Sequence, residues 1–461
     1  MTRDNGLLMN ILNSNELQVL FQNRLAGLEQ KQLLPEQINS CVSKLAQRQG
    51  INSKIIGFSF AEQAINCVSL GSGPTKILMW TQMHGDESTA TSAVLDIIHL
   101  LSCDESQSIL ANHLPSNWAS LITLFVVPML NPDGALANTR ENAQGIDINR
   151  DALALQSPEG RILNDLVQEL QADFAFNLHD QHDYYRCGDK GKSSTLAFLA
   201  PAFDPQKSID TNRRQAMALI ALMYKQSNVL LPDGIARYDD EFSARSFGDQ
   251  IAKSGISTIL IESGHYPNDE LRQVARTMNV FTLLSALKAI CEPNYWCSEE
   301  GSTELEALYW QIPENREYKL CDLLIKQVSF ADGSYTADIA IRKNSRFEKH
   351  YMVADLGDLH EQYGLSSFDA AGYDYDPGRP YLLKEHLCLT NESYAELLNQ
   401  GFSHFVGDAN LLENRSDYYA FENPKFWHDR KKMTKGIISA GFLCKGGQRA
   451  FAIIMADLIE L

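Results

Sequence analysis

The 461-residue sequence predicts an α/β fold with a mixed, mostly parallel sheet, followed by a second region rich in β-strands. Between residues 54 and 291, short apolar runs alternate with longer segments of helical periodicity, which is the pattern of a sheet covered by helices. Several apolar runs are continuous, as expected of strands that are buried on both faces. After Cys297 the long helical segments give way to successive strand-like runs.

Residues 1–50 are predicted to form an N-terminal helical segment. Apolar residues recur at helical spacing from about residue 15 to residue 49, beginning with Leu17, Leu20 and Phe21. Pro35 suits the first turn of a second helix. The first residues lack the basic start, the unbroken apolar stretch and the small-residue cleavage site of a secretory signal, so we expect none.

The central region, residues 51–295, is predicted to hold the sheet and its helices. Strands are expected at 54–60, 65–70, 76–82, 121–128, 173–179, 195–200 and 256–262. Helices are expected at 88–102, 158–171, 207–227 and 268–291. The sequence has no uninterrupted apolar run of about 18 residues, so we expect no helix that spans a membrane.

The C-terminal part is predicted as a β-rich accessory domain at 300–461. The acidic stretch EEGSTELE, residues 299–306, is interpreted as a linker that leads into it. Strand-like runs follow at 319–330, 335–342, 350–355, 437–444 and 449–458. The sequence KGGQ, between the last two runs, is typical of a hairpin turn.

Charge and cysteine usage limit the partners and the compartment. Lys and Arg total 40 against 58 for Asp and Glu, a formal net charge of -18. Without surplus cations to neutralise phosphates, the chain is not expected to bind nucleic acid or an anionic membrane. Its nine cysteines are scattered and contain no CxxC pair, which is typical of a reduced, cytoplasmic protein.

The first chemically suggestive segment is MHGDEST, which follows the strand expected at 76–82. His84 and Glu87 lie three residues apart on the turn into the next helix. An imidazole and a carboxylate suit a catalytic zinc site that takes a third protein ligand and keeps one position open. The alternative is ordinary helix capping, with Ser88 as the cap and acidic residues favoured by the helix dipole.

A third metal ligand is predicted at the end of the strand at 173–179. His179 ends this apolar run and would emerge at the edge of the sheet, whereas His182, three residues on, is the rival ligand. Asp180 and Asp183 are candidates to orient an imidazole from behind, as carboxylates often do around metal-binding histidines.

Two further segments carry candidate catalytic groups. After the turn sequence NPDG, Arg140 and Arg150 lie in the spacing R-x-N-x-x-G-x-D-x-N-R, which suits recognition of a carboxylate and stabilisation of an oxyanion. The alternative is that both arginines lie on a solvated loop and form surface ion pairs. Glu262 ends the strand at 256–262, where a partly desolvated carboxylate suits a general base; the alternative is a helix cap or an ion pair.

Taken in chain order, these segments resemble the zinc carboxypeptidase family over about residues 50–291. The family pattern is H-x-x-E, then NPDG, then the long R-x-N motif, then a strand-end His and a strand-end Glu. The resemblance implies a zinc-carboxypeptidase-like sandwich with one Zn²⁺ held by His84, Glu87 and His179.

The resemblance also implies roles for other residues. Glu262 would act as general base and then as proton shuttle, and Arg140 would polarise the scissile carbonyl. The substrate-binding residues would be Asn149 and Arg150, which hold the terminal carboxylate, and Tyr238, which lies 24 residues before Glu262 and covers the substrate.

The predicted function is that of a metallocarboxypeptidase, which removes C-terminal residues from small peptides or muropeptides with a free carboxylate. The expected partner is a peptide or an amino-acid-derived substrate with a free carboxylate. One alternative function is a zinc N-acyl-amino-acid amidohydrolase of the succinylglutamate desuccinylase and aspartoacylase type. The other is a non-catalytic binding protein with this fold. The NPDG and R-x-N motifs favour a peptidase, and the presence of Glu262 beside three ligands favours an enzyme. The sequence predicts no particular oligomeric state.

Overall fold

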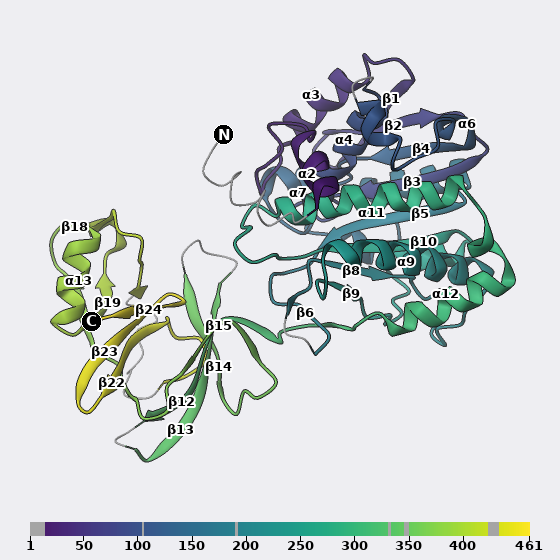
Figure 1. The fold of residues 1–461 in the computed structure, drawn as a ribbon. Helices are drawn as coiled ribbons and strands as arrows, with labels where there is room; N and C mark the ends of the chain where they lie inside the picture. Colours follow the sequence, from purple (N-terminus) through teal and green to yellow (C-terminus); the bar gives the residue numbers. More distant parts are fainter. Residues whose placement is uncertain (1–13, 104–105, 190–191, 331–332, 345–349, 423–432) are drawn as a thin grey trace. The chain divides into compact units, whose positions relative to one another are not determined.

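The computed structural model describes residues 14–103, 106–189, 192–330, 333–344, 350–422 and 433–461. The chain divides into two compact units, one that ends at Arg316 and one that begins at Glu317 (Figure 1). Each unit has its own hydrophobic core, so the two are described separately.

Unit 1 is built on a mixed sheet with the strand order β1-β2-β4-β3-β5-β10-β8-β9. Strands β1, β4, β3, β5 and β10 run in one direction, and β2, β8 and β9 run in the other. This confirms the mixed, mostly parallel sheet. The bounds are β1 Ile51–Phe58, β2 Ala64–Gly71, β3 Thr75–Thr81, β4 Ile122–Val127, β5 Phe174–Asp180, β8 Leu196–Leu199, β9 Ile235–Arg237 and β10 Ser257–Ser263.

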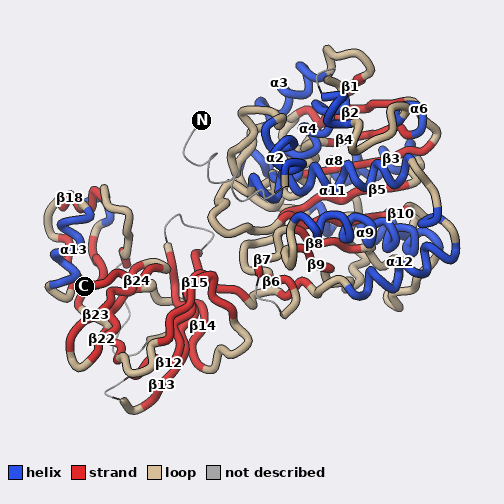
Figure 2. The backbone as a smooth tube through the Cα atoms, in the orientation of Figure 1, coloured by secondary structure: helices blue, strands red, loops and turns tan. Residues whose placement is uncertain are grey.

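Helices cover both faces of this sheet (Figure 2). Alternate residues of β3 show the division, because Ile77 and Met79 enter one core and Leu78 and Trp80 enter the other. The first core also contains α2 Asn15–Gln22, α3 Pro35–Leu45, α4 Thr89–Leu101, α9 Thr211–Leu230, α11 Gln273–Cys291 and α12 Glu299–Gln311. The second contains α8 Pro158–Leu170 and α10 Phe247–Lys253.

Helix α11 is apolar almost all round. By length and composition it would be able to cross a membrane, but 89% of its most apolar window is buried inside the fold. It packs against α4 and α9. Its apolar residues are therefore explained by core packing, as is usual for a helix that is hydrophobic on every side.

The prediction of a linker at residues 299–306 is wrong, because this stretch begins helix α12. The Ser298 hydroxyl caps the helix by accepting the Gly301 N–H at 3.0 Å. Leu305 and Tyr309, four residues apart, bury their side chains, and the helix packs against α9. Two of the acidic residues that suggested a linker, Glu299 and Glu300, occupy the first turn, where the helix dipole favours them.

Unit 2 is β-rich, as predicted. Its main sheet has the order β14-β13-β12-β16-β22-β23-β24, with β15 paired to β12. The bounds are β12 Leu320–Phe330, β13 Tyr335–Lys343, β14 Tyr351–Gly357, β15 Tyr363–Asp369, β16 Asp374–Asp376, β22 Ala440–Lys445, β23 Gln448–Ile454 and β24 Asp457–Glu460. The expected single run at 449–458 is two strands, since the chain turns at Met455, which has a positive φ of 58°.

The KGGQ hairpin is confirmed, because Lys445 pairs with Gln448 across the turn. Gly446 and Gly447 both have positive φ, as a two-residue turn between twisted strands requires. Other elements of unit 2 were not predicted: β17 Arg379–Leu383, β18 Leu387–Leu389, α13 Asn391–Asn399, β19 Phe402–Gly407, β20 Leu412–Asn414 and β21 Phe421–Glu422.

Candidate metal centre and active site

The candidate residues of unit 1 meet at one edge of the sheet. His84 and Glu87 follow β3, whereas His179 and Glu262 each occupy the second-last position of their own strands, β5 and β10. Because β3, β5 and β10 are parallel, their carboxyl ends lie at the same edge. His179 and Glu262 are direct partners in the register of β5 and β10. This is the edge where open α/β sheets place their ligands.

His84, Glu87 and His179 form one tight group. One ligand atom from each of the three side chains lies within 4.8 Å of the others. Each carboxylate oxygen of Glu87 is close to one ring: Oε1 is 2.7 Å from Nδ1 of His84, and Oε2 is 2.8 Å from Nδ1 of His179. The two Nδ1 atoms are 3.1 Å apart. The rival ligand His182 instead places its ring centroid 4.4 Å from that of Tyr185.

The chemistry of this group fits a divalent cation. Both Nδ1 atoms and both Glu87 oxygens carry lone pairs when deprotonated, and all four point into the same small space. A cation satisfies such converging lone pairs, and nitrogen together with carboxylate oxygen is a ligand set that zinc accepts. His84, Glu87 and His179 are therefore the residues that would hold the metal.

Asp147 supports the group from behind, a role that the sequence did not reveal. Its Oδ1 lies 3.1 Å from Nε2 of His84, the ring nitrogen that faces away from Glu87. The same oxygen accepts the backbone N–H of Asn149 at 2.9 Å. A carboxylate behind a metal-binding imidazole fixes its orientation and increases its basicity. The signal was present, since Asp147 is the aspartate of the R-x-N-x-x-G-x-D-x-N-R spacing.

The surrounding carboxylates make the site electronegative. Burial alone would lower the pKa of His84, but Glu87 and Asp147 outweigh burial and raise the pKa of His84 to about 9. Burial alone would raise the pKa of Glu87, but His84 and His179 hold it well below its usual range. Positive charge is thus favoured on His84, whereas burial lowers the pKa of His179 and favours its neutral ring, the form that binds a metal.

Glu262 lies beside the group and is only 8% exposed. Its Oε2 is buried and has no hydrogen-bond partner among the residues that the structure describes. Burial and the charge of Glu87 raise the pKa of Glu262 well above its usual value. A buried carboxyl group with one uncommitted oxygen, at the edge where the ligands converge, has the character of a general base.

Arg140 also reaches the group. Its Nε donates to Oδ2 of Asp147 at 3.0 Å, and Nη1 lies 3.1 Å from Nδ1 of His84 and 3.4 Å from Oε1 of Glu87. Its side chain is partly exposed. A cation fixed at this position is suited to a developing oxyanion.

Asn149 and Arg150, the predicted carboxylate-binding pair, lie in the 3₁₀ turn Ile148–Arg150 beside Asp147. The side-chain oxygen of Asn149 accepts the backbone N–H of Phe247 at 3.0 Å, so it caps the start of α10. Arg150 donates to the backbone oxygen of Asn149 at 2.8 Å. The structure thus places both beside the site and gives Asn149 a structural contact as well, while their role in substrate binding stays a prediction.

Tyr238 lies farther along the sheet, directly after β9. Its backbone N–H donates to Phe198 at 2.8 Å, and its hydroxyl is 3.3 Å from that of Tyr185. β9 is separated from β10 by β8. The predicted role of Tyr238 over a substrate is not tested by these contacts.

A buried cation that sequence analysis missed joins the ends of β5 and β10. Arg272 donates to the backbone oxygens of Gln181 at 2.7 Å and Ser263 at 3.0 Å, and to Asp183 at 2.8 Å. Its charge outweighs burial and lowers the pKa of Asp183 to about 2. Asp183 thus binds Arg272, whereas it was a candidate to orient an imidazole.

Asp180, at the end of β5, contacts both Glu87 and the start of α4. Its backbone N–H donates to Oε2 of Glu87 at 3.2 Å, and its carboxylate accepts the hydroxyl of Thr89 at 2.7 Å. Burial raises the pKa of Asp180 to about 6 despite the nearby Arg272. Asp180 therefore holds the start of α4 against β5, while the carboxylate found behind an imidazole is Asp147.

Residues 131–134, predicted as a tight turn and here called the NPDG turn, form the capped start of the short helix α7 Pro132–Ala137, which packs directly behind the first candidate ligand. Gly85 approaches Gly134 so closely that a Cβ built on Gly85 would lie 1.9 Å from the backbone of Gly134. The Asn131 amide donates to Met83 and to Arg140, both at 3.3 Å. These contacts join the turn, the first ligand segment and the arginine loop.

Comparisons with known proteins found partial matches to this chain. The family described as zinc carboxypeptidase matches residues 38–194. An uncharacterised protein of Zymomonas mobilis is 25% identical over 148 residues, which are 31% of this chain and 37% of that protein. Carboxypeptidase 2 of Trichophyton tonsurans is 23% identical over 187 residues, which are 39% of this chain and 29% of that protein. The chain thus spans about a third of the length of these curated relatives.

Solved structures that match part of the chain include a metallo-carboxypeptidase from Burkholderia cenocepacia, with a TM-score of 0.45 and 18% identity over 56% of this chain and 69% of that one. Another is carboxypeptidase A from Helicoverpa armigera, with a TM-score of 0.48 and 14% identity over 63% of this chain and 81% of that one. The matching segment contains the first two ligands, the NPDG turn, the arginine motif and His179. Over residues 38–194 the chain is thus similar to the zinc carboxypeptidase family.

Proposed function

We propose that this protein is a zinc-dependent carboxypeptidase that removes C-terminal residues from peptides. The observation that carries the proposal is the convergence of His84, Glu87 and His179 within 4.8 Å at the edge of the sheet where Glu262 lies. An ion held by converging ligands beside a buried carboxyl group is the arrangement that metal-assisted hydrolysis needs.

A bound zinc ion would supply Lewis acidity, which polarises the scissile carbonyl and acidifies water. The residues of the chain would do the rest. Oε2 of Glu262, which has no hydrogen-bond partner within the described part of the chain, takes the proton of the attacking water and then delivers it to the departing nitrogen. Arg140 donates hydrogen bonds to the oxygen on which negative charge develops.

The free carboxylate of the substrate is the proposed ligand of Arg150 and Asn149, with Tyr238 closing over it. A guanidinium is suited to this task because it matches the planar carboxylate. The proposed substrates are short peptides, with muropeptides as a related class that presents the same free carboxylate. The proposed place of action is the cytoplasm, which suits a chain whose nine cysteines are all free.

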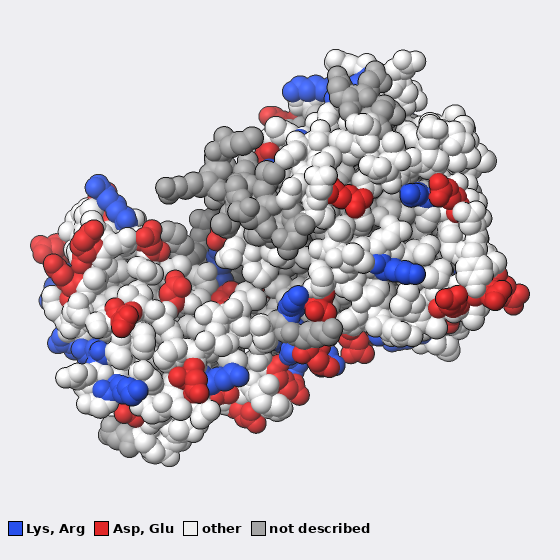
Figure 3. All heavy atoms as spheres, viewed as in Figure 1, with Lys and Arg blue, Asp and Glu red and all other residues white. Residues whose placement is uncertain are grey.

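Nucleic acid is not among the proposed partners. On the face drawn in Figure 3, described acidic and basic side chains are interspersed and no broad basic area is seen. Together with the net charge of -18, this distribution offers little to attract a polyanion.

The test of the proposed function is Glu262→Gln, assayed on peptides with free C-termini and on acyl-amino acids. Loss of the general base is expected to lower kcat by about 10²–10⁴-fold while zinc remains bound, because Glu262 is not among the three ligands. Metal content by mass spectrometry and turnover with and without chelator measure the two effects separately.

Glu292→Gln is the matched control, because it makes the same change at an exposed position after α11. It is expected to keep wild-type turnover. Wild-type-like turnover in Glu262→Gln would show that Glu262 is not the general base. Turnover of acyl-amino acids alone would replace the peptidase with the amidohydrolase alternative.

A further inference from the structure

The hairpin that joins β1 to β2 lies on the same edge of the sheet as the metal group. β1 runs parallel to β4, β3, β5 and β10, so its carboxyl end, at Phe58, is on the edge that carries His84, His179 and Glu262. Residues 58–63, here called the Phe60 hairpin, therefore project from the rim on which the proposed catalytic residues lie.

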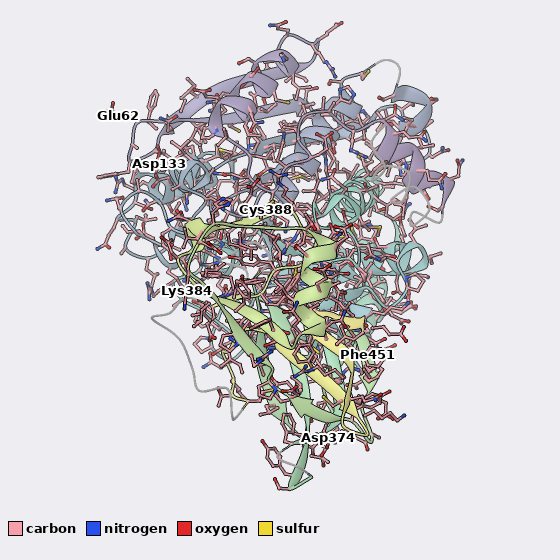
Figure 4. The ribbon with its side chains drawn as sticks, turned by 90° about the vertical axis from the view of Figure 1, so that its left-hand side faces the viewer. Glu62, Asp133, Asp374, Lys384, Cys388 and Phe451 are labelled. Atoms are coloured by element: carbon pink, nitrogen blue, oxygen red, sulfur yellow. The ribbon has the colours of Figure 1, made fainter. Side chains whose placement is uncertain are left out.

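Two buried carboxylates anchor this hairpin. Asp133 of the NPDG turn accepts the hydroxyl of Ser59 at 2.6 Å and the backbone N–H of Ala61 at 2.9 Å. Glu159 accepts the backbone N–H of Phe60 at 3.0 Å. Both carboxylates are buried, so these charge-assisted bonds hold the turn firmly. Figure 4 labels Asp133 and Glu62, the latter within the hairpin, on the same flank of unit 1.

The anchors also tie the hairpin to the loop that carries Arg140. The other oxygen of Glu159 accepts the amide of Asn142 at 2.9 Å. Asn131, two residues before Asp133, donates to the backbone oxygen of Arg140 at 3.3 Å. Hydrogen bonds thus join the hairpin, the NPDG turn and the arginine loop, whose Arg140 lies beside the metal group.

The Phe60 hairpin exposes two aromatic side chains to solvent. Phe58 is 54% exposed and Phe60 is 56% exposed, whereas Ser59 between them is buried. Exposed aromatic side chains on a rigid support are the usual anchors of recognition surfaces, because little conformational entropy is lost when they are covered.

The distance from the hairpin to the metal group suits an extended peptide. β1 is three positions from β3 and four from β5 in the sheet. With strands about 4.8 Å apart, the hairpin lies about 14–19 Å from the group along the edge. An extended chain advances about 3.3 Å per residue, so about four to six residues cover that distance. Asn149 contacts α10, which packs on β10, so the carboxylate end would lie away from the hairpin.

We propose that the Phe60 hairpin is a docking surface for apolar side chains about four to six residues upstream of the C-terminus of a linear peptide substrate. The inference rests on the proposed carboxypeptidase function and adds a substrate class to it. It makes the protein selective for peptides of about six residues or more over dipeptides.

The test uses three substrates with the same C-terminal dipeptide: the N-acylated dipeptide itself, an octapeptide with leucines at the fourth to sixth upstream positions, and an octapeptide with serines there. The wild-type protein is expected to show a kcat/KM about tenfold higher for the leucine octapeptide than for the other two. In the double variant Phe58→Ser, Phe60→Ser, the kcat/KM for the leucine octapeptide divided by that for either other substrate is expected to fall to about one. Val229→Ser, which changes a 77% exposed residue on α9, is the matched control and is expected to keep the ratio.

The outcomes separate this inference from the function on which it rests. If no peptide is hydrolysed, the proposed function fails and the inference with it. If all three substrates are hydrolysed at equal kcat/KM, or if the double variant keeps the leucine preference, the inference alone is overturned. A dimer that the double variant dissociates, with the preference unchanged, assigns the hairpin to a second copy of the chain and also overturns it. The melting temperature of the double variant checks that its fold is intact.

Discussion

At the scale of single residues, the site depends on how each imidazole is held. His84 lies between two carboxylates, with Nδ1 2.7 Å from Glu87 and Nε2 3.1 Å from Asp147. Asp147 also accepts from Arg140 and from the backbone of Asn149. One side chain thus orients a proposed metal ligand, the proposed oxyanion donor and the turn that carries the proposed carboxylate-binding pair.

Asp147→Asn is therefore expected to weaken zinc binding about 10–100-fold, because the amide cannot act as the anionic acceptor behind His84. Competition with a chromogenic chelator measures the dissociation constant. Asp165→Asn, at an exposed position of α8, is the matched control and is expected to bind zinc as the wild type does. An unchanged dissociation constant in Asp147→Asn would show that His84 does not need this support.

At the scale of elements, helix α12 shows how a polar stretch becomes part of a core. Glu299, Glu300 and Glu304 are exposed, whereas Glu306 accepts from Arg214 of α9 at 2.7 Å. Tyr309 is fully buried, and its hydroxyl accepts the backbone N–H of Ala200, just after β8, at 3.2 Å. Burial raises the pKa of Tyr309 to about 12. The phenol is therefore kept neutral in the folded protein at a pH where it ionises in the unfolded chain.

This shift predicts how stability depends on alkaline pH. The folded pKa of about 12 lies above the unfolded value of 10.0, so the contribution of Tyr309 is fully present below pH 10 and is lost as pH rises towards 12. Tyr309→Phe is expected to be less stable at pH 8 by about 1–3 kcal/mol, since the Ala200 N–H loses its acceptor. Its stability is expected to decline less steeply than that of the wild type between pH 10 and 11. Urea unfolding at each pH measures both effects, and parallel declines would contradict the assignment.

At the scale of the whole molecule, the chain contains two units with separate cores. The core of unit 1 surrounds its eight-stranded sheet and carries all the proposed site residues, whereas unit 2 packs around β12, β13, β22 and their neighbours. A ligand that binds only the folded form of one unit stabilises that unit alone.

Calorimetry of the full chain is accordingly expected to show two unfolding transitions, of which zinc shifts only one. At a free zinc concentration of 100 times the dissociation constant, the stabilisation of unit 1 is expected to be about 2.7 kcal/mol. Chelator should reverse the shift. A zinc response in both transitions, or only in the transition of unit 2, would contradict the location of the metal in unit 1.

Much of the fold of unit 1 was predictable because its strands are uninterrupted apolar runs. β3, β4, β5 and β10 lie within one or two residues of their expected positions. The short strands of unit 2 were harder to predict, because the half-exposed residues of β15, with Tyr363 and Leu365 open to solvent, lack a clear apolar pattern. The acidic start of α12 was misread because its burial depends on contact with α9.

By itself, the sequence determined that His84, Glu87, His179 and Glu262 follow or end buried strands, and parallel strands bring such positions to one edge. Only the tertiary structure decided that Asp147 supports His84, that Arg272 joins the ends of β5 and β10, and that the Phe60 hairpin is anchored on the NPDG turn. The reason is physical: apolar periodicity is a local property that any stretch of chain reveals. The partner of a buried polar group, by contrast, is chosen by which distant segments the packed core brings within hydrogen-bonding distance.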